Sequence, residues 1–286
     1  MAIKIKRRTP NRSILGDLTN ILFLLGFAAF MALPLVYAVN NAFKPLEELF
    51  QFPPKFFVRN PTLDNIRDLF ALMNSSWVPF TRYIFNTFFI TIVGSAFHLV
   101  VSSLAAYVLA KHKFPGQKIF FSMVIMALMF SPHVTAIPNY LIISQLGWVN
   151  TYWALIVPAI AAPLGLFLMK QFMEQIPVSL LESARLDGAN EFTIFMKVAM
   201  PLVKPAWLTL LIFSFQALWN MNGGTFIYNE ALKTLPTALQ QIVATGFSRA
   251  GAASAIALFM MIVPLAFFIF SQSRVIETMS TSGIKD

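Results

Sequence analysis

Residues 119–169, IFFSMVIMALMFSPHVTAIPNYLIISQLGWVNTYWALIVPAIAAPLGLFLM, form a stretch of 51 residues without a single Asp, Glu, Lys or Arg. A helix that crosses the hydrocarbon core of a membrane needs roughly 20 predominantly apolar residues. This stretch is too long for one crossing and long enough for two joined by a tight turn. The sequence Gln145-Leu146-Gly147-Trp148-Val149-Asn150 predicts that turn, because glycine and asparagine are typical turn residues.

Four further charge-free stretches flank this one, and each is long enough for a single crossing. They contain 26, 28, 25 and 24 residues and cover Leu18–Phe43, Tyr83–Ala110, Pro205–Asn229 and Ala250–Ser273. The composition agrees with a membrane protein, because only 12% of the residues are charged, against about 25% in soluble domains. The sequence therefore predicts an all-α polytopic membrane protein with six transmembrane helices, and excludes a soluble enzyme.

Basic residues are divided unevenly between the loops that six helices would create. Of the 21 Lys and Arg residues, 14 lie on the side that carries both termini. Since basic loops favour the cytoplasm, we expect a cytoplasmic N-terminus (1–17), a membrane domain (18–274) and a cytoplasmic tail (275–286). Within the membrane domain, 44–82 would be an external loop and 176–204 a cytoplasmic loop. This topology explains the net charge of +9 without any binding to nucleic acid.

The predicted helices contain no charged residue, and their only histidines are His98 and His133. Ion-coupled carriers place acidic residues or chains of histidines within the bundle, whereas isolated histidines are more typical of hydrogen-bonded helix packing. The chain also lacks a P-loop, an H-E-x-x-H motif and any cysteine. We therefore expect no catalytic residue, metal site or cofactor in this chain, and an energy source in a partner.

The longest of the predicted cytoplasmic loops and its flank read PVSLLESARLDGANEFTIFMKVAMPLVKP over residues 177–205. Ser179 and Glu182 match a capping box and predict a helix that starts at Ser179. Gly188 would end this helix, and a second short helix would run from about Asn190 and stop before Pro201. The segment is thus expected to form a helix–bend–helix elbow. The alternative is an interfacial helix pair that merely connects two spans.

This elbow resembles the E-A-A-x-x-x-G-x9-I-x-L-P loop of permease subunits in binding-protein-dependent ABC importers. The matching residues are Glu182, Ser183, Ala184, Gly188, Val198, Met200 and Pro201. Ser183, Val198 and Met200 replace the usual Ala, Ile and Leu, and none of these changes disrupts a helix–bend–helix. Asp187-Gly188-Ala189, together with Ile137-Pro138-Asn139-Tyr140, is similar to the sugar-importing branch. Within that branch the chain looks like the six-helix partner of maltose-type transporters.

The resemblance implies that the elbow is a coupling loop that docks on a cytoplasmic ATPase subunit. Glu182 would contact the ATPase, Gly188 would permit the bend, and the small residues Ser183 and Ala184 would allow close packing; Asp187 and Pro201 complete the implied coupling set. Glu182 could instead act only as a helix cap. Asp187 could be a solvated charge or pair with Arg185.

The implied assembly lies in the bacterial cytoplasmic (inner) membrane, surrounded by lipid. Its partners would be a homologous second permease, two ATP-binding subunits that hold ATP and Mg, and an extracellular or periplasmic solute-binding protein. The chain itself would hydrolyse nothing and would conduct a sugar or oligosaccharide. The alternatives are an ABC importer for a non-sugar solute such as a glycerol phosphodiester, and an ion-coupled carrier.

Two sets of residues are candidates for contact with the solute and with its binding protein. Gln216 and Asn220 are four residues apart and share a helix face, and with Trp219 they could line the path of the solute. They could equally form hydrogen bonds between helices, with Trp219 at the membrane interface. The glycine-containing segment Asn222-Gly223-Gly224 could protrude towards the binding protein, or be a flexible connector.

Overall fold

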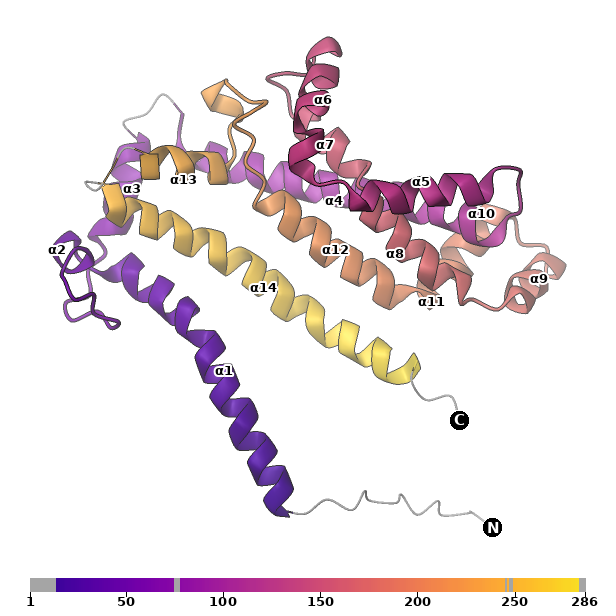
Figure 1. Ribbon diagram of the computed structural model, residues 1–286, viewed down its shortest axis with the longest axis horizontal. Coiled ribbons are helices and arrows are strands. Elements are labelled where there is room, and N and C mark those ends of the chain that lie inside the picture. The colour runs from indigo at the N-terminus through magenta and orange to yellow at the C-terminus, as the bar shows by residue number, and fades with distance from the viewer. Residues whose placement is uncertain (1–13, 75–77, 245, 247–248, 283–286) are drawn as a thin grey trace.

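The computed structural model describes residues 14–74, 78–244, 246 and 249–282, and these residues form helices and connecting loops without a strand (Figure 1). The first half contains α1 (Ile14–Phe43), α2 (Leu46–Leu49), α3 (Asp64–Asn74), α4 (Phe80–Lys111), α5 (Gln117–Met129), α6 (Pro132–Gln145) and α7 (Trp153–Ile160). The second half contains α8 (Pro163–Glu174), α9 (Val178–Leu186), α10 (Glu191–Ile194), a π-helical turn (Phe195–Ala199), α11 (Met200–Leu202), α12 (Lys204–Trp219), a 3₁₀ turn (Glu230–Leu232), α13 (Leu235–Ala244) and α14 (Ala250–Ser282).

The predicted all-α polytopic fold is confirmed. Four helical segments in the described part of the chain are long and apolar enough to cross a membrane: Leu15–Phe43, Phe80–Lys111, Trp153–Glu174 and Ala250–Ser271. Two bent helix pairs bring the number to six if each pair is one crossing. The pair α5–α6 is bent by 110°, and the segment Glu191–Leu202 is bent by 81° against α12.

Three of the predicted spans differ from single straight helices. The fourth is interrupted between Ile160 and Pro163, and prolines or turn residues explain the differences in the third and the fifth. The third is broken at Ser131, because Pro132 disfavours a helical conformation in the residue before it; Ser131 instead caps α6 and accepts a hydrogen bond from the His133 N–H. The fifth was expected to extend to Asn229, but α12 ends at Trp219. Lack of charge thus continues beyond the helix into a loop.

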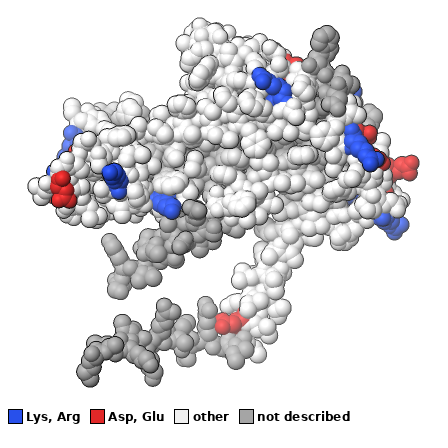
Figure 2. Space-filling view, turned by 180° about the vertical axis from the view of Figure 1, so that it is seen from behind, with Lys and Arg blue, Asp and Glu red and all other residues white. Residues whose placement is uncertain are grey.

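The bundle has two distinct ends, which are called here the elbow end, with α9 to α11, and the loop end, with α2, α3 and α13 (Figure 1). α4 runs between them and packs against α7, α8 and α12, while α14 packs against α12 and α1. α1 diverges from the bundle, and its apolar window has no buried residue. Charged residues gather towards the two ends, with a broad uncharged surface between them (Figure 2), as expected if lipid surrounds the middle.

His98 stabilises the break in the fourth predicted span, within Trp153–Glu174. α7 ends at Ile160 and α8 begins at Pro163, which leaves the Ile160 carbonyl without its helical partner. The Nδ1 atom of His98 lies 2.9 Å from this carbonyl oxygen and must carry the proton, since a carbonyl only accepts. An unpaired carbonyl would be costly in a membrane. The hydrogen-bonded packing role expected for His98 is confirmed.

Candidate functional site

The elbow bends at Gly188, as the sequence predicted. Gly188 has φ +80°, a left-handed conformation that side chains with a Cβ atom rarely adopt. The N–H of Ala189 donates to the Ala184 carbonyl, and the N–H of Gly188 donates to the Arg185 carbonyl, each at 3.0 Å. These two bonds form a Schellman motif, which satisfies the last carbonyls of α9. The bend is therefore fixed by backbone geometry.

The predicted capping box is wrong. α9 begins at Val178, with Pro177 in the cap position and no side chain that caps the helix. Because Pro177 already holds the backbone angle that suits a helix start, Ser179 falls inside the first turn, where its carbonyl accepts a hydrogen bond from the Ser183 hydroxyl at 2.9 Å. Glu182 is exposed. The alternative that Glu182 serves only as a cap is thereby excluded.

The second arm starts where the sequence predicted but continues further. The Asn190 side chain caps α10 by accepting a hydrogen bond from the Thr193 N–H at 2.8 Å. The helix does not stop before Pro201, because a π-helical turn over Phe195–Ala199 leads into α11. In this wider turn the Met200 N–H donates to the Phe195 carbonyl, five residues back. A π turn can absorb the proline that an α-helix would not accept.

Glu191 ties the elbow to the end of α4. One carboxylate oxygen accepts a 2.8 Å bond from Arg185 Nε, and the other lies 3.2 Å from the Tyr107 hydroxyl and 3.6 Å from His112 Nε2. The salt bridge expected as an alternative between Arg185 and Asp187 is therefore wrong, since Arg185 pairs with Glu191. Asp187 is exposed and caps α9 through its backbone. Sequence reasoning missed Glu191, because nothing local marks its contact with α4.

The outward surface of the elbow mixes charged and apolar side chains. Leu186 is 89% exposed, although it lies on an element whose inner side is anchored by the buried residues Leu181 and Ile194. The residues matched to the coupling motif are also accessible, because Glu182, Ser183, Asp187, Gly188 and Pro201 are exposed and Ala184 is half-buried. The elbow therefore presents the residues of the coupling motif, together with an exposed leucine, on a rigid element.

Glu191→Gln is expected to loosen the elbow at neutral pH. The hydrogen bond from Arg185 is the main cause that holds the pKa of Glu191 below its ordinary value of 4.5. Since the folded-state pKa is the lower one, this stabilisation is present above 4.5 and is lost as the pH falls through the folded-state pKa. An exposed pair contributes about 0.5 kcal/mol, so amide exchange over 185–191 should quicken a few-fold. Glu182→Gln is the matched control, because it keeps the pair between Glu191 and Arg185. Acidification should loosen the wild-type chain and this control, and should have no such effect on Glu191→Gln.

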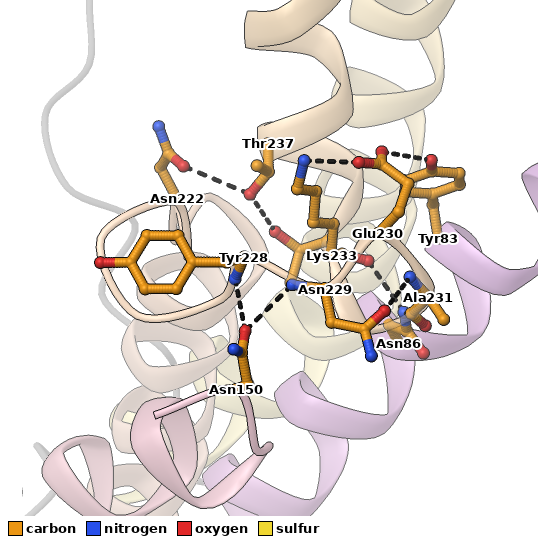
Figure 3. Close-up of polar contacts among 11 residues, drawn as sticks. Tyr83, Asn86, Asn150, Asn222, Tyr228, Asn229, Glu230, Ala231, Lys233 and Thr237 are labelled. Atoms are coloured by element: carbon orange, nitrogen blue, oxygen red, sulfur yellow. Dashed lines mark hydrogen bonds and ion pairs between the residues drawn. The ribbon is translucent and has the colours of Figure 1, made fainter. Parts of the chain in front are cut away.

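A second polar cluster holds the loop between α12 and α13 at the loop end (Figure 3). The Asn150 side chain accepts hydrogen bonds from the N–H groups of Tyr228 and Asn229, at 2.6 and 2.9 Å. Asn86 donates to the carbonyls of Ala231 and Lys233, both at 2.9 Å. The loop is thus attached to α4 and to the turn before α7, and the alternative of a flexible connector does not describe it.

Glu230 is the charged centre of this cluster. It accepts a 2.6 Å hydrogen bond from the Tyr83 hydroxyl and lies 2.5 Å from Lys233 Nζ (Figure 3). Partial burial alone would raise the pKa of Glu230, but the hydrogen bonds from Lys233 and Tyr83 outweigh it, so the pKa lies below its ordinary value. The negative charge of Glu230 is thus compensated by Lys233 of the same chain, as expected for a residue that holds the loop in place.

Asn86→Leu is expected to release this loop. The Asn86 side chain is fully buried. Leucine would remove the Asn86 donor from the Lys233 carbonyl and the acceptor of the Tyr152 hydroxyl, and would leave the Ala231 carbonyl with its bond from Arg82 Nε. Each unsatisfied buried group costs about 1–3 kcal/mol. Limited proteolysis within 220–234 should therefore become faster, and the melting temperature in detergent should fall. Asn139→Leu, at an exposed amide on α6, is the control, and equal proteolysis of the two variants would contradict the prediction.

The candidate solute and binding-protein residues divide into two groups. Gln216 and Asn220 are exposed on the same face of α12, and Asn220 Nδ2 donates to the Gln216 carbonyl. Trp219 is buried; its Nε1–H donates to the Met260 carbonyl at 3.0 Å, so it joins α12 to α14 in this conformation. Asn222 Oδ1 accepts hydrogen bonds from the Gly224 N–H and the Thr237 hydroxyl, and this brace orders the segment with Gly223.

Most of the chain is similar to known proteins. The family described as "Binding-protein-dependent transport system inner membrane component" matches residues 98–279, a range that contains the elbow and the braced loop. This chain belongs to that family. The inner-membrane component is 36% identical to protein LplC of Bacillus subtilis, over 79% of this chain and 75% of LplC. It is 31% identical to the arabinooligosaccharides transport system permease protein AraQ of Halalkalibacterium halodurans, over 98% and 100%.

The solved structure of a bacterial ABC transporter involved in the import of the acidic polysaccharide alginate has a chain of the same fold. The TM-score is 0.77 at 22% identity, over 93% of this inner-membrane component and 99% of that chain. At this identity the likeness supports the architecture alone. Within the described residues, no group of three His, Asp or Glu side chains could hold a metal ion.

Proposed function

We propose that this inner-membrane component is the six-span permease subunit of a carbohydrate ABC importer and conducts a sugar or oligosaccharide into the cytoplasm. The observation that carries the proposal is the rigid elbow, which holds the residues of the coupling motif with three conservative replacements and exposes Glu182, Ser183, Asp187, Gly188 and Pro201. The arabinooligosaccharide relative, which aligns over its entire length, supports a saccharide as the solute.

The elbow would transmit the motion of a cytoplasmic ATPase. Glu182, Ser183, Ala184 and Asp187 would face a cleft on that subunit, and the Schellman motif at Gly188 would keep the two arms at a fixed angle. Glu191 connects the elbow to α4, and Lys111 Nζ donates to the Ile176 carbonyl at 2.7 Å. A push on the elbow would therefore reach the bundle without being absorbed by a flexible hinge. ATP and Mg would be held by the partner subunits alone.

The elbow end would face the cytoplasm. The described end of α14 points towards the elbow end, and the described beginning of α1 lies away from the loop end, although α1 diverges from the bundle (Figure 1). Both termini would therefore lie on the cytoplasmic side of a bacterial inner membrane, in agreement with the distribution of basic residues. The loop end would then face the external solute-binding protein. A homologous second permease would complete the path through the membrane.

Gln216 and Asn220 would line the solute path, because their side chains are accessible on α12 whereas Trp219 supports the helix from behind. The braced segment Asn222-Gly223-Gly224 would meet the binding protein. Its order favours a preformed contact, since a rigid loop loses less conformational entropy on binding than a mobile one.

The test is a mild-detergent pull-down of the tagged chain from its native membrane. We expect a P-loop ATPase, a second permease and a solute-binding protein to co-purify, and the solute that this binding protein retains identifies the cargo. A glycerol phosphodiester in its place would replace the carbohydrate assignment by the non-sugar alternative. Recovery of the chain alone, with transport that collapses on addition of an ionophore, would overturn the proposal in favour of an ion-coupled carrier.

A further inference from the structure

The loop after α2 presents large aromatic side chains to its surroundings. Residues 50–58 read FQFPPKFFV, and within this stretch Phe52 is 92% exposed and Phe57 is 68% exposed. Phenylalanine gains most of its stabilisation from burial, so two such side chains close together on one loop indicate a contact surface. The described part of the chain does not cover them.

This loop is ordered, although its tip is exposed. Lys44 Nζ donates to the Lys55 carbonyl at 2.5 Å, and Lys44 is buried. On the far side of the loop, the two carboxylate oxygens of Glu48 accept hydrogen bonds from the N–H groups of Arg59 and Asn60, at 3.0 and 3.1 Å. Phe52 and Phe57 are therefore presented by a fixed scaffold rather than by a random segment.

The loop folds back along α1 instead of standing beyond its end. The Phe56 ring lies 5.6 Å from the Tyr37 ring, and the Val58 N–H donates to Asn40 Oδ1 at 3.1 Å. Tyr37 precedes the last residue of α1, Phe43, by six positions, or about 9 Å along a helix. The contact is thus within Leu15–Phe43, a segment long and apolar enough to cross a membrane. Figure 1 shows the loop on the α1 side of α2.

We propose that residues 50–58 form an anchor in the lipid interface at the loop end, with Phe52 and Phe57 inserted at the boundary between headgroups and acyl chains. A loop beside the last turns of a transmembrane helix lies at that depth, where membrane proteins concentrate their interfacial aromatic side chains. Lys55 lies between Phe52 and Phe57 in the sequence and Arg59 follows them, and the charge of both is complementary to lipid phosphates. A bilayer accounts for the exposed phenylalanines, for the position of the loop along α1 and for the two basic residues. The anchor fixes the depth of the bundle in the membrane, whichever solute is carried.

The absence of cysteine from the chain allows a direct test with single-cysteine variants. Phe52→Cys and Phe57→Cys are labelled with a nitroxide in the complex as purified and reconstituted into vesicles of phosphatidylethanolamine and phosphatidylglycerol. Collisions with oxygen, which concentrates in lipid, are compared with collisions with a water-soluble nickel chelate. Leu22→Cys, at an exposed position within α1, is the lipid reference, and Arg67→Cys, at an exposed position on α3, is the water reference.

The oxygen-to-nickel collision ratio at positions 52 and 57 is expected to exceed that at Arg67→Cys and to approach that at Leu22→Cys. Ratios equal to that at Arg67→Cys would overturn the anchor. Addition of the solute-loaded binding protein is expected to leave the collision ratio and the mobility of both labels unchanged. Labels that are exposed to water in vesicles and become immobilised by that protein would identify a protein-docking loop instead. The measurement does not depend on which partners co-purify, so its failure is distinct from failure of the proposed function.

Discussion

Glu182→Lys is expected to abolish solute-stimulated ATP hydrolysis by the assembled importer while leaving the chain folded and inserted. Glu182 is exposed on α9 and takes no part in capping that helix, so the substitution leaves the elbow intact. At the proposed contact it places a cation where the ATPase receives an anion. Loss of a charge pair that becomes buried costs roughly 2–5 kcal/mol, and every 1.4 kcal/mol is about tenfold in affinity. ATP hydrolysis in lipid nanodiscs measures the loss.

The matched control for this charge reversal is Asp64→Lys, because Asp64 is an exposed acid on α3 at the opposite end of the bundle. It should retain normal stimulation. Gly188→Pro provides a second perturbation of the same surface, since proline cannot adopt φ +80° and removes the N–H that donates to the Arg185 carbonyl. Stimulation at the wild-type level in both elbow variants would remove the elbow from the coupling mechanism.

Gly165→Leu is expected to prevent the chain from reaching its folded state in the membrane. A Cβ atom on Gly165 would lie 2.3 Å from His98 Nε2 and 2.6 Å from Ser102 Oγ, so α4 and α8 could no longer pack as they do. The His98 ring would have to leave the Ile160 carbonyl. Overpacking costs about 1–3 kcal/mol, and the unpaired carbonyl costs about 1–3 kcal/mol more, a sum comparable with much of the stability of a domain.

Gly26→Leu is the control for this substitution, because a Cβ at Gly26 on α1 meets nothing within 4 Å. Its yield and its melting temperature, measured by fluorescence-detected size exclusion, should match the wild type. His98→Leu should have an intermediate effect, since it removes the hydrogen bond without forcing two helices apart. If Gly165→Leu melts at the wild-type temperature, the close approach of α4 and α8 is not required for folding.

Much of the membrane architecture could be predicted from where charge is absent. Water is missing from the bilayer core, and a charged side chain there is costly, so uncharged stretches mark the segments that lipid surrounds. Lack of charge does not report backbone conformation, however. The bend at Ser131 depends on the proline that follows it. The loop after Trp219 stays uncharged as far as Asn229, because its polar groups up to that point are amides and hydroxyls. These features separate the six expected spans from the four segments that are long enough, without a sharp bend, to cross a membrane.

Two local features of the elbow, the turn at Gly188 and the start of the second arm at Asn190, could also be predicted from the sequence, whereas the capping box at Ser179 was wrong. Gly188 and Asn190 act on the backbone within a few residues of themselves, so their turn and cap can be inferred from sequence alone. The contact of Glu191 with Tyr107 spans 84 positions, and that of Asn86 with Ala231 spans 145. Neither produces a periodic pattern in the sequence, and only the packing of α4 against the elbow and the loop reveals them.

The π turn at Phe195–Ala199 makes the tolerance of the elbow to changes in length differ along its second arm. It contains one residue more than an α-helical turn, so a one-residue deletion within it is expected to restore regular hydrogen bonds and to leave the helix beyond it in register. The buried side of Val203, Ala206 and Leu210 would then still face the core. A one-residue deletion in an α-helical turn instead rotates everything beyond it by about 100° and shifts it by about 1.5 Å, so deletions elsewhere between Asn190 and Lys204 should be incompatible with a folded permease.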